Sequence, residues 1–317
     1  MKSRIIWMVV AGLFIAVSFF LIGEFVNNPE GKGPVVNSRS VTSASSEAKR
    51  WTPISFLNLS EYTQNDQRQL RITGIAEPKS LIVLRNRGED LHQIRSDEAG
   101  DWVTTLDVNE QAMVIEAVMF IEDNDVSIRA EETIFRIPVP SSENIPAAEF
   151  ITPALIMVSA PGAPSRIIQS PFGGAPAVAS LSLAAIDYDD AGGVIFSGAT
   201  TGKGRIRLYA GGQAIGETRI GIDGRWTFIA GKMLPLGEYI VRADLIRPDG
   251  NRTQLSLPFE RLAPLPVSGK GGEGAMSINF EPYRWQIRRT LIGGGVQNTV
   301  VFSPRIVLPK ADEVKEK

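Results

Sequence analysis

Cysteine is absent from this chain of 317 residues, and histidine occurs once, as His92. Without cysteine the chain has no disulfides, thiolate nucleophiles, iron–sulfur clusters or cysteine-based zinc sites. A single imidazole excludes metal sites built from several histidines and most histidine-based catalytic arrangements. These absences point away from enzymatic chemistry, and we expect no catalytic residue, no cofactor and no metal site.

An excess of positive charge is also missing. The chain has 33 Lys and Arg residues against 35 Asp and Glu residues, for a formal net charge of −2, which gives no support for a nucleic-acid partner. The length suggests two or three domains, because single cores rarely grow beyond about 250 residues. Frequent glycine (30) and proline (20) are typical of short strands joined by turns, so we expect a mainly β protein.

The one long apolar run covers residues 5–23 and carries no charged side chain. As a helix it would span about 28 Å, close to the hydrocarbon thickness of a bilayer. Lys2 and Arg4 precede the run and Glu24 follows it. The positive-inside rule therefore places residues 1–4 in the cytoplasm and the bulk of the chain on the other side of the membrane.

A cleaved signal peptide is the alternative for this segment. Signal peptides have an apolar region of about 7–15 residues that ends at a small-residue cleavage site. This run is longer, ends with Phe19–Ile22, and is not followed by an Ala-x-Ala pattern, so we favour an uncleaved signal-anchor. Residues 24–50 contain serine, glycine and proline with little apolar periodicity, and we expect them to form a flexible linker.

An internal repeat relates two parts of the chain at a fixed offset of 124 residues. Glycines, a tryptophan and an alternating apolar pattern recur in the same register. The matched pairs are Gly74 and Gly198, Ile82 and Ile206, Leu84 and Leu208, Gly100 and Gly224, Trp102 and Trp226, Ile115 and Tyr239, Ala117 and Val241, Met119 and Ala243, and Ile121 and Leu245. The period is too long for a solenoid unit, so the sequence predicts two related domains.

Each repeat has the pattern of an antiparallel β-unit. Residues 205–209, RIRLY, alternate polar and apolar side chains, as a half-buried strand does. Asp223 and Gly224 supply a turn before a strand that places Trp226 and Phe228 on the same side. We therefore expect two Ig-like β-sandwiches. Their ranges are 51–140 and 181–262, with a Pro/Ala-rich linker at 141–180.

Short segments of both repeats carry a family resemblance. ITGIAEP and GDW in the first repeat, and FSGATTG and DGRW in the second, resemble bacterial Ig-like domains. The segment LPLGEY, which ends at Tyr239, is similar to that family's Leu-x-x-Gly-x-Tyr corner, where a tyrosine hydroxyl holds a loop. The first repeat has Ile115 at the position of this tyrosine.

The segments AIDYDDAGGVIFSG, RIRLYAGG, DGRW, GEYIVRADL and LPFER resemble a group of proteobacterial envelope proteins more specifically. The resemblance covers most of residues 180–261 and is weaker over residues 66–138. It implies an inner-membrane anchor, periplasmic Ig-like domains and a C-terminal LysM module that binds peptidoglycan.

A degenerate LysM-like module is expected at residues 276–310, after a Pro/Gly linker at 263–275 and before a charged tail at 311–317. LysM modules have a βααβ layout, and the sequence WQIRR from Trp285 is similar to the start of their first helix. Two features depart from that family: Pro282–Arg284 replace the usual Gly-Asp/Asn-Ser/Thr run, and the second helix is missing. The implied fold is a small α+β remnant, in which glycan binding is either retained or lost.

Five residues of this module are candidates for contact with a glycan or a partner: Tyr283, Arg284, Trp285, Arg288 and Arg289. Aromatic rings stack on sugars, but an aromatic beside aliphatic residues at helical spacing is more often part of a core. The arginines could meet acidic groups, or could form the solvated face of a short helix.

The remaining candidate sites are weaker. Two acidic loops could bind calcium through oxygen ligands, although neither has EF-hand spacing and both also fit polar turns. Their acidic residues are Asp187, Asp189 and Asp190, and Glu122, Asp123 and Asp125. An outward-facing His92 is more plausible than a general base, because no positioned nucleophile accompanies it. The Gly-rich stretches lack the pattern of a phosphate loop.

These observations predict a non-enzymatic, inner-membrane-anchored periplasmic protein that binds peptidoglycan or spaces a domain towards it. The alternative is an accessory subunit of a membrane complex, which would dock on an envelope protein through its transmembrane helix or an Ig-like edge strand. An envelope hydrolase would need a catalytic domain that the sequence does not reveal.

Overall fold

The computed structural model describes eight segments of the chain, which contain twenty strands and no helix. They cover residues 50–121, 126–140, 153–172, 181–189, 193–230, 234–263, 276–290 and 296–304. No helix of this part of the chain could cross a membrane. The expected span at residues 5–23 and linker at 24–50 lie outside the described residues, except Arg50. Residues 50–317 form one compact unit.

The first β-sandwich packs a sheet in the order β1-β2-β5 against strands in the order β4-β3-β6-β7. Three strands facing four is the arrangement of a seven-stranded Ig-like sandwich. Its strands are β1 (Ser55–Gln64), β2 (Gln67–Ile75), β3 (Leu81–Asn86), β4 (Glu89–Arg95), β5 (Asp101–Asp107), β6 (Met113–Ile121) and β7 (Val126–Arg129).

The second β-sandwich repeats this order, with β11-β12-β15 facing β14-β13-β16-β17. Gly74 pairs with Trp102 in the first sandwich, and Gly198 pairs with Trp226 in the second, so the predicted repeat is confirmed strand by strand. The second set of strands is β11 (Ser182–Asp189), β12 (Val194–Ala199), β13 (Arg205–Ala210), β14 (Gln213–Arg219), β15 (Arg225–Ile229), β16 (Gly237–Ile246) and β17 (Arg252–Arg261).

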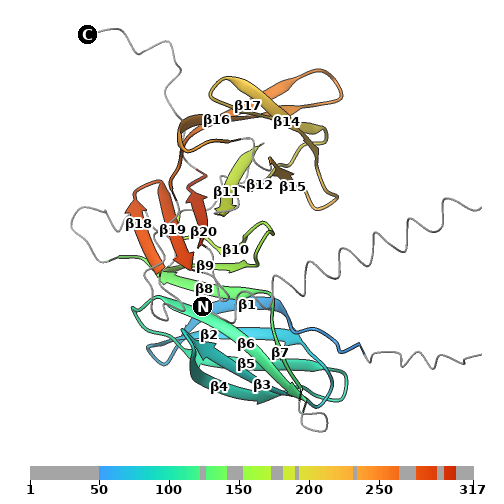
Figure 1. Cartoon of the computed structure of the whole chain (residues 1–317), viewed down its shortest axis with the longest axis vertical. Helices are drawn as coiled ribbons and strands as arrows, with labels where there is room; N and C mark the ends of the chain where they lie inside the picture. Colours follow the sequence, from blue (N-terminus) through green and yellow to red (C-terminus); the bar gives the residue numbers. More distant parts are fainter. Residues whose placement is uncertain are drawn as a thin grey trace, which may run out of the picture. The chain divides into compact units, whose positions relative to one another are not determined.

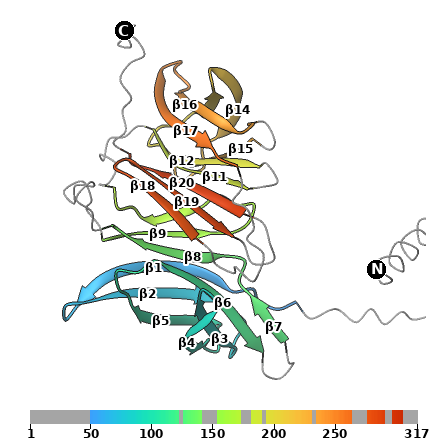
Figure 2. The same ribbon diagram turned by 60° about the vertical axis from the view of Figure 1, so that its left-hand side comes forward.

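Six further strands form a third layered region that the sequence did not predict (Figures 1 and 2). Strand β8 pairs with β6 and extends the first sandwich towards β9 and β10, while β20 pairs with β11 and extends the second towards β19 and β18. These strands are β8 (Thr133–Pro138), β9 (Ala154–Ser159), β10 (Arg166–Gln169), β18 (Met276–Glu281), β19 (Arg284–Thr290) and β20 (Val296–Phe302).

A third hydrophobic core lies between these two extensions. It includes Phe135 of β8, Met157 of β9, Trp285 of β19 and Val301 of β20. On the other face of β8, Ile134 belongs to the first sandwich's core, and on the other face of β20 Val300 and Phe302 belong to the second sandwich's core. Strands β8 and β20 are therefore shared walls that join the two sandwiches.

Two expectations need correction. The segment 141–180 is not a plain linker, because its described part contains β9 and β10. The helix expected from Trp285 is strand β19, hydrogen-bonded to β18 on one side and β20 on the other. A strand covered on both faces loses the polar alternation that identifies a strand in sequence, so its pattern was open to a helical interpretation.

Candidate functional site

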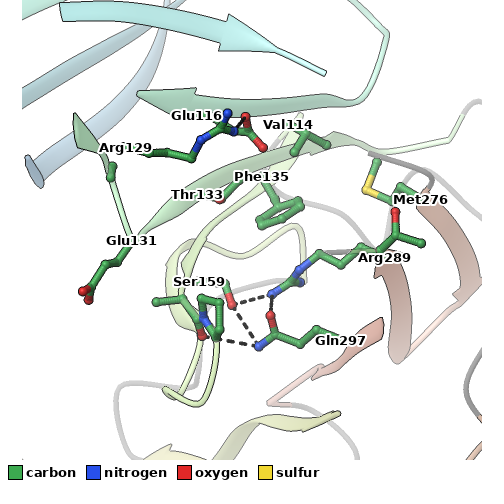
Figure 3. Close-up of a pocket in the computed structure, with 14 residues that line it drawn as sticks. Val114, Glu116, Arg129, Glu131, Thr133, Phe135, Ser159, Met276, Arg289 and Gln297 are labelled. Carbon is green, nitrogen blue, oxygen red and sulfur yellow. Dashed lines mark hydrogen bonds and ion pairs between the residues drawn. The ribbon is translucent and has the colours of Figure 1, made fainter. Parts of the chain in front are cut away.

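An open cavity of about 450 Å³ lies where the third region meets β6, β7 and β8 (Figure 3). Its walls come from both halves of the chain, since β6–β9 belong to one sheet and β18–β20 to another. The lining residues are Val114, Glu116, Arg129, Ala130, Glu131, Thr133, Phe135, Ser159, Ala160, Pro161, Met276, Arg289, Thr290 and Gln297.

The side chain of Arg289 forms the cationic part of the cavity wall, although the residue is only 4% exposed. Its Nη2 donates to Ser159 Oγ (2.5 Å) and Gln297 Oε1 (2.6 Å), and its Nη1 donates to Thr299 Oγ1 (3.3 Å). The guanidinium carbon lies 4.2 Å from the centre of the Phe135 ring, within the range of a cation–π interaction. Each of these three hydrogen bonds ends on a neutral oxygen.

The buried carboxyl group of Asp187 lies behind Arg289, and the hydroxyl group of Thr299 bridges the two side chains. Thr299 donates its hydroxyl to Asp187 Oδ1 at 2.6 Å while accepting from Arg289. Ser165 completes the shell of Asp187, donating its hydroxyl to Oδ1 (2.7 Å) and its backbone N–H to Oδ2 (2.8 Å). The network thus joins β19, β20, β11 and the segment before β10.

Burial shifts the pKa values of Asp187 and Arg289 in the directions that favour their neutral forms. Burial raises the pKa of Asp187 above its usual value, opposed by the hydrogen bonds from Ser165 and Thr299 and by the charge of Arg289. Burial lowers the pKa of Arg289 to about 10, opposed by the charge of Asp187. Arg289 therefore stays cationic at neutral pH.

The wall formed by β6 and β7 carries an ion pair. Arg129 Nη1 donates to Glu116 Oε2 at 2.8 Å, and the Glu116 side chain is 11% exposed. The charges of this pair offset each other. Among the described lining residues, Arg289 is the cation whose hydrogen bonds all go to neutral oxygens. A guanidinium in such a wall can form charge-assisted hydrogen bonds with an anionic group.

The five candidate contact residues do not form one surface. Trp285 is fully buried against Phe172 and Phe280, which confirms the core interpretation of this aromatic, and Arg289 faces the cavity. Tyr283 is exposed at the turn between β18 and β19.

The other two arginines point to the second sandwich and its following segment. Arg284 donates to Glu281 (2.6 Å) and to the carbonyl of Pro258 (3.4 Å), and Arg288 donates to the carbonyl of Ala263 (2.7 Å). Successive residues of a strand point to opposite faces, which is why β19 separates Arg284 and Arg288 from Trp285 and Arg289.

Of the acidic loops, the described part shows two aspartates. Both oxygens of Asp187 are used by Ser165 and Thr299, and Asp189 accepts the backbone N–H of Gly193 at 3.1 Å. Asp190, Glu122, Asp123 and Asp125 lie outside the described residues. Within the described segments, no group of three or more acidic or histidine side chains could hold a metal ion.

His92 is exposed on β4, an edge strand, as its outward-facing interpretation predicted. The polar residues around Arg289 were missed, with the exception of Asp187, because Ser159, Ser165, Gln297 and Thr299 carry no motif. They are brought together only when β20 inserts beside β11.

Neither a family model nor a curated protein matches this sequence. Solved structures of β-sandwich modules do match, and three of them illustrate the similarity. The fibronectin(III)-like modules of Clostridium thermocellum CbhA are 10% identical with a TM-score of 0.19, over 61% of this chain and 84% of that one. The central fibronectin-III array of RIM-binding protein is 9% identical with a TM-score of 0.23, over 75% and 80%.

The third match is a Ca²⁺-stabilized adhesin with which an Antarctic bacterium binds ice. It is 11% identical with a TM-score of 0.21, over 80% of this chain and 91% of that one. The Ig-like assignment rests on the strand order of the two sandwiches.

Proposed function

We propose that this chain is a non-enzymatic accessory subunit of a membrane complex in the cell envelope. Residues 5–23 would anchor it in the inner membrane, and residues 50–317 would form a periplasmic body that binds a protein partner. The apolar run and its flanking charges support the anchor.

The observation that supports this proposal over a wall-binding protein is the position of β18–β20. A glycan-binding module at the end of a spacer would be a separate unit with an open groove. Here β18–β20 close the third core and share β20 with the second sandwich. Trp285 is interior, and Arg289 forms hydrogen bonds within the fold. This arrangement favours a rigid body that presents its surfaces to a partner.

The sheet edges offer backbone groups for such a partner. Strands β4 and β10 end one sheet, β15 and β18 end another, and β14 and β17 end a third. Unpaired N–H and C=O groups of an edge strand can pair with an extended segment of another protein. Strand β17 carries Pro258, which removes one donor from such pairing, so the other edges are the better candidates.

Purification from native membranes tests this proposal. The tagged full chain would be extracted in mild detergent, cross-linked, and compared with residues 50–317 expressed in the same compartment. We expect a partner that co-purifies in fixed stoichiometry and cross-links to the folded body in both forms. Loss of the partner from residues 50–317 would assign docking to the N-terminal segment, and a lone monomer in every preparation would contradict the proposal.

Sedimentation with purified peptidoglycan tests the competing function. We expect residues 50–317 to stay in the supernatant. Sedimentation of the protein with peptidoglycan would support the wall-binding function if the folded variants Tyr283→Ala and Arg288→Ala no longer sedimented with it. A reporter fused to the C-terminus checks the topology, since activity of the reporter in the cytosol would contradict a periplasmic body.

A further inference from the structure

We propose that the cavity between β6–β8 and β19–β20 binds a small organic carboxylate with an apolar body. The carboxylate would pair with the guanidinium of Arg289, and the body would lie against Val114, Phe135 and Met276. This site is separate from the edge-strand docking proposed above, and either can hold without the other.

The first argument is the charge of Arg289. A desolvated cation is costly unless an anion contacts it, yet the hydrogen bonds of this guanidinium go to Ser159, Gln297 and Thr299. Asp187 is linked to Arg289 only through hydroxyl groups, those of Thr299 and of Ser159 and Ser165. An anion that enters the cavity would make the direct contact that these neutral partners do not provide.

The second argument is the geometry of the donors. A guanidinium has five N–H donors, and Arg289 uses three of them for Ser159, Gln297 and Thr299. A carboxylate would take the remaining N–H groups or replace one of these neutral acceptors. The ring of Phe135, 4.2 Å away, supports this group from one side. Beside it, the amide nitrogen of Gln297 reaches Ser159 Oγ and the Ala160 carbonyl only at 3.5 Å. Hydrogen bonds of that length are weak, so a ligand oxygen could replace either acceptor while Gln297 Oε1 keeps its hydrogen bond from Arg289.

The third argument is the composition of the walls. The volume of about 450 Å³ is within the range of small-molecule sites. Apolar side chains of Val114, Phe135, Pro161 and Met276 line it together with the polar groups. The carboxylate of Glu116 is bonded to Arg129, so it opposes an incoming anion less than a free carboxylate would. A bare inorganic anion would use only the Arg289 end.

Calorimetric titration of residues 50–317, which form a compact unit with their own cores, tests the proposal. The probes are acetate, hexanoate, 4-phenylbutyrate, the neutral 4-phenylbutanamide and inorganic phosphate. We expect affinity to rise from acetate to 4-phenylbutyrate, and the neutral amide to bind at least about tenfold more weakly than the acid. The full chain in detergent should give the same ranking.

Three variants locate the site. Arg289→Gln should weaken 4-phenylbutyrate binding by at least about tenfold, and because this variant could misfold, Ala160→Phe provides a second route by filling the cavity with Arg289 in place. Arg71→Gln, which makes the same substitution at an exposed position of β2 outside the cavity, is the matched control and should leave affinity unchanged. Near-ultraviolet circular dichroism checks that each variant is folded.

Three results would overturn the proposal. They are the absence of saturable binding of every carboxylate up to roughly 10 mM, equal binding of the acid and its amide, and phosphate binding as tight as that of 4-phenylbutyrate. Binding that survives both Arg289→Gln and Ala160→Phe would place the ligand elsewhere and would also overturn it.

Discussion

The indole ring of Trp226 on β15 lies directly against the backbone of Gly198, the residue opposite it on β12. A Cβ atom on Gly198 would be 2.5 Å from Trp226 Cζ2 and would also collide with the carbonyl oxygen of Ser182. Gly74 and Trp102 repeat this contact in the first sandwich. The glycine therefore makes room for the central tryptophan of each core.

The first prediction concerns this contact. Gly198→Ala should lower the free energy of unfolding by about 1–3 kcal/mol, because the tryptophan or the strand must shift to accommodate the methyl group. Urea unfolding followed by tryptophan fluorescence measures the change. Gly193→Ala is the control, since its added Cβ would meet only the Asp189 carboxylate at 3.7 Å. Equal effects of the two substitutions would contradict the packing argument.

The second prediction concerns the buried ion pair between Glu61 of β1 and Arg136 of β8, whose side chains are 2% and 0% exposed. Arg136 donates from Nη2 and Nε to Glu61, at 2.9 and 3.2 Å. Glu61→Gln should cost about 3 kcal/mol of stability, because a buried arginine loses its counter-charge. Glu110→Gln, which breaks the exposed pair with Arg68, should cost less than about 1 kcal/mol.

The third prediction separates a core tryptophan from a sugar platform. Trp285→Ala should lower the free energy of unfolding by about 3–5 kcal/mol, as expected for a large cavity in the third core. Tyr283→Ala, at an exposed position two residues earlier, should change it by less than about 0.5 kcal/mol. Chemical denaturation of both variants measures the contrast. A Trp285→Ala protein with unchanged stability would show that the third core contributes little.

The fourth prediction is a pH dependence. Because burial raises the pKa of Asp187 above its ordinary value of 3.8, the folded state binds this proton more tightly than the unfolded state does. The contribution of Asp187 to the free energy of unfolding is therefore fully present below pH 3.8, and it is lost as the pH rises through the pKa of the folded state. Urea unfolding at several pH values should show Asp187→Asn gaining stability relative to the original protein across that interval.

Asp249 supplies the opposite case for comparison. It is exposed, and the backbone and side-chain hydrogen bonds from Asn251 lower its pKa. Stability from this group is present above its ordinary pKa and is lost as the pH falls, so Asp249→Asn should lose stability relative to the original protein as the pH rises. Parallel trends for the two variants would contradict the assignment.

The fifth prediction tests the tyrosine corner. The Tyr239 hydroxyl donates to the carbonyl of Pro235 at 2.9 Å, which confirms the role that the Leu-x-x-Gly-x-Tyr pattern predicted. Tyr239→Phe should cost about 1 kcal/mol, the typical value of one hydrogen bond. Tyr62→Phe, at an exposed position of β1, is the matched control and should be neutral within about 0.5 kcal/mol. Thermal unfolding of both variants provides the comparison.

The two sandwiches were predictable because their strands have one face in a core and one in solvent. Strand β5 alternates buried and exposed residues along its whole length, and its tryptophan recurs in β15 at the repeat offset. Such strands carry their own signal. The tyrosine corner was equally local, since Pro235 and Tyr239 lie four residues apart.

The third core was not predictable from the same signals. Every residue of β9 and of β20 is buried, so neither strand alternates. Strand β20 also pairs with β11, which lies far earlier in the sequence, as well as with its neighbour β19. Arg289 shows the consequence for the site. Beside Arg288 it has the pattern of a solvated basic run, and only the pairing of β20 with β11 encloses it with Ser159 and Asp187.

The placement of β20 between β11 and β19 has a consequence for biosynthesis. A chain synthesised from its N-terminus completes both sandwich repeats before residues 296–302 emerge. Until then the apolar inner faces of β8 and β9 and the open edge of β11 have no cover. Nascent protein should therefore depend on a holding chaperone until the last strand arrives, and premature termination should yield a product that proteases remove.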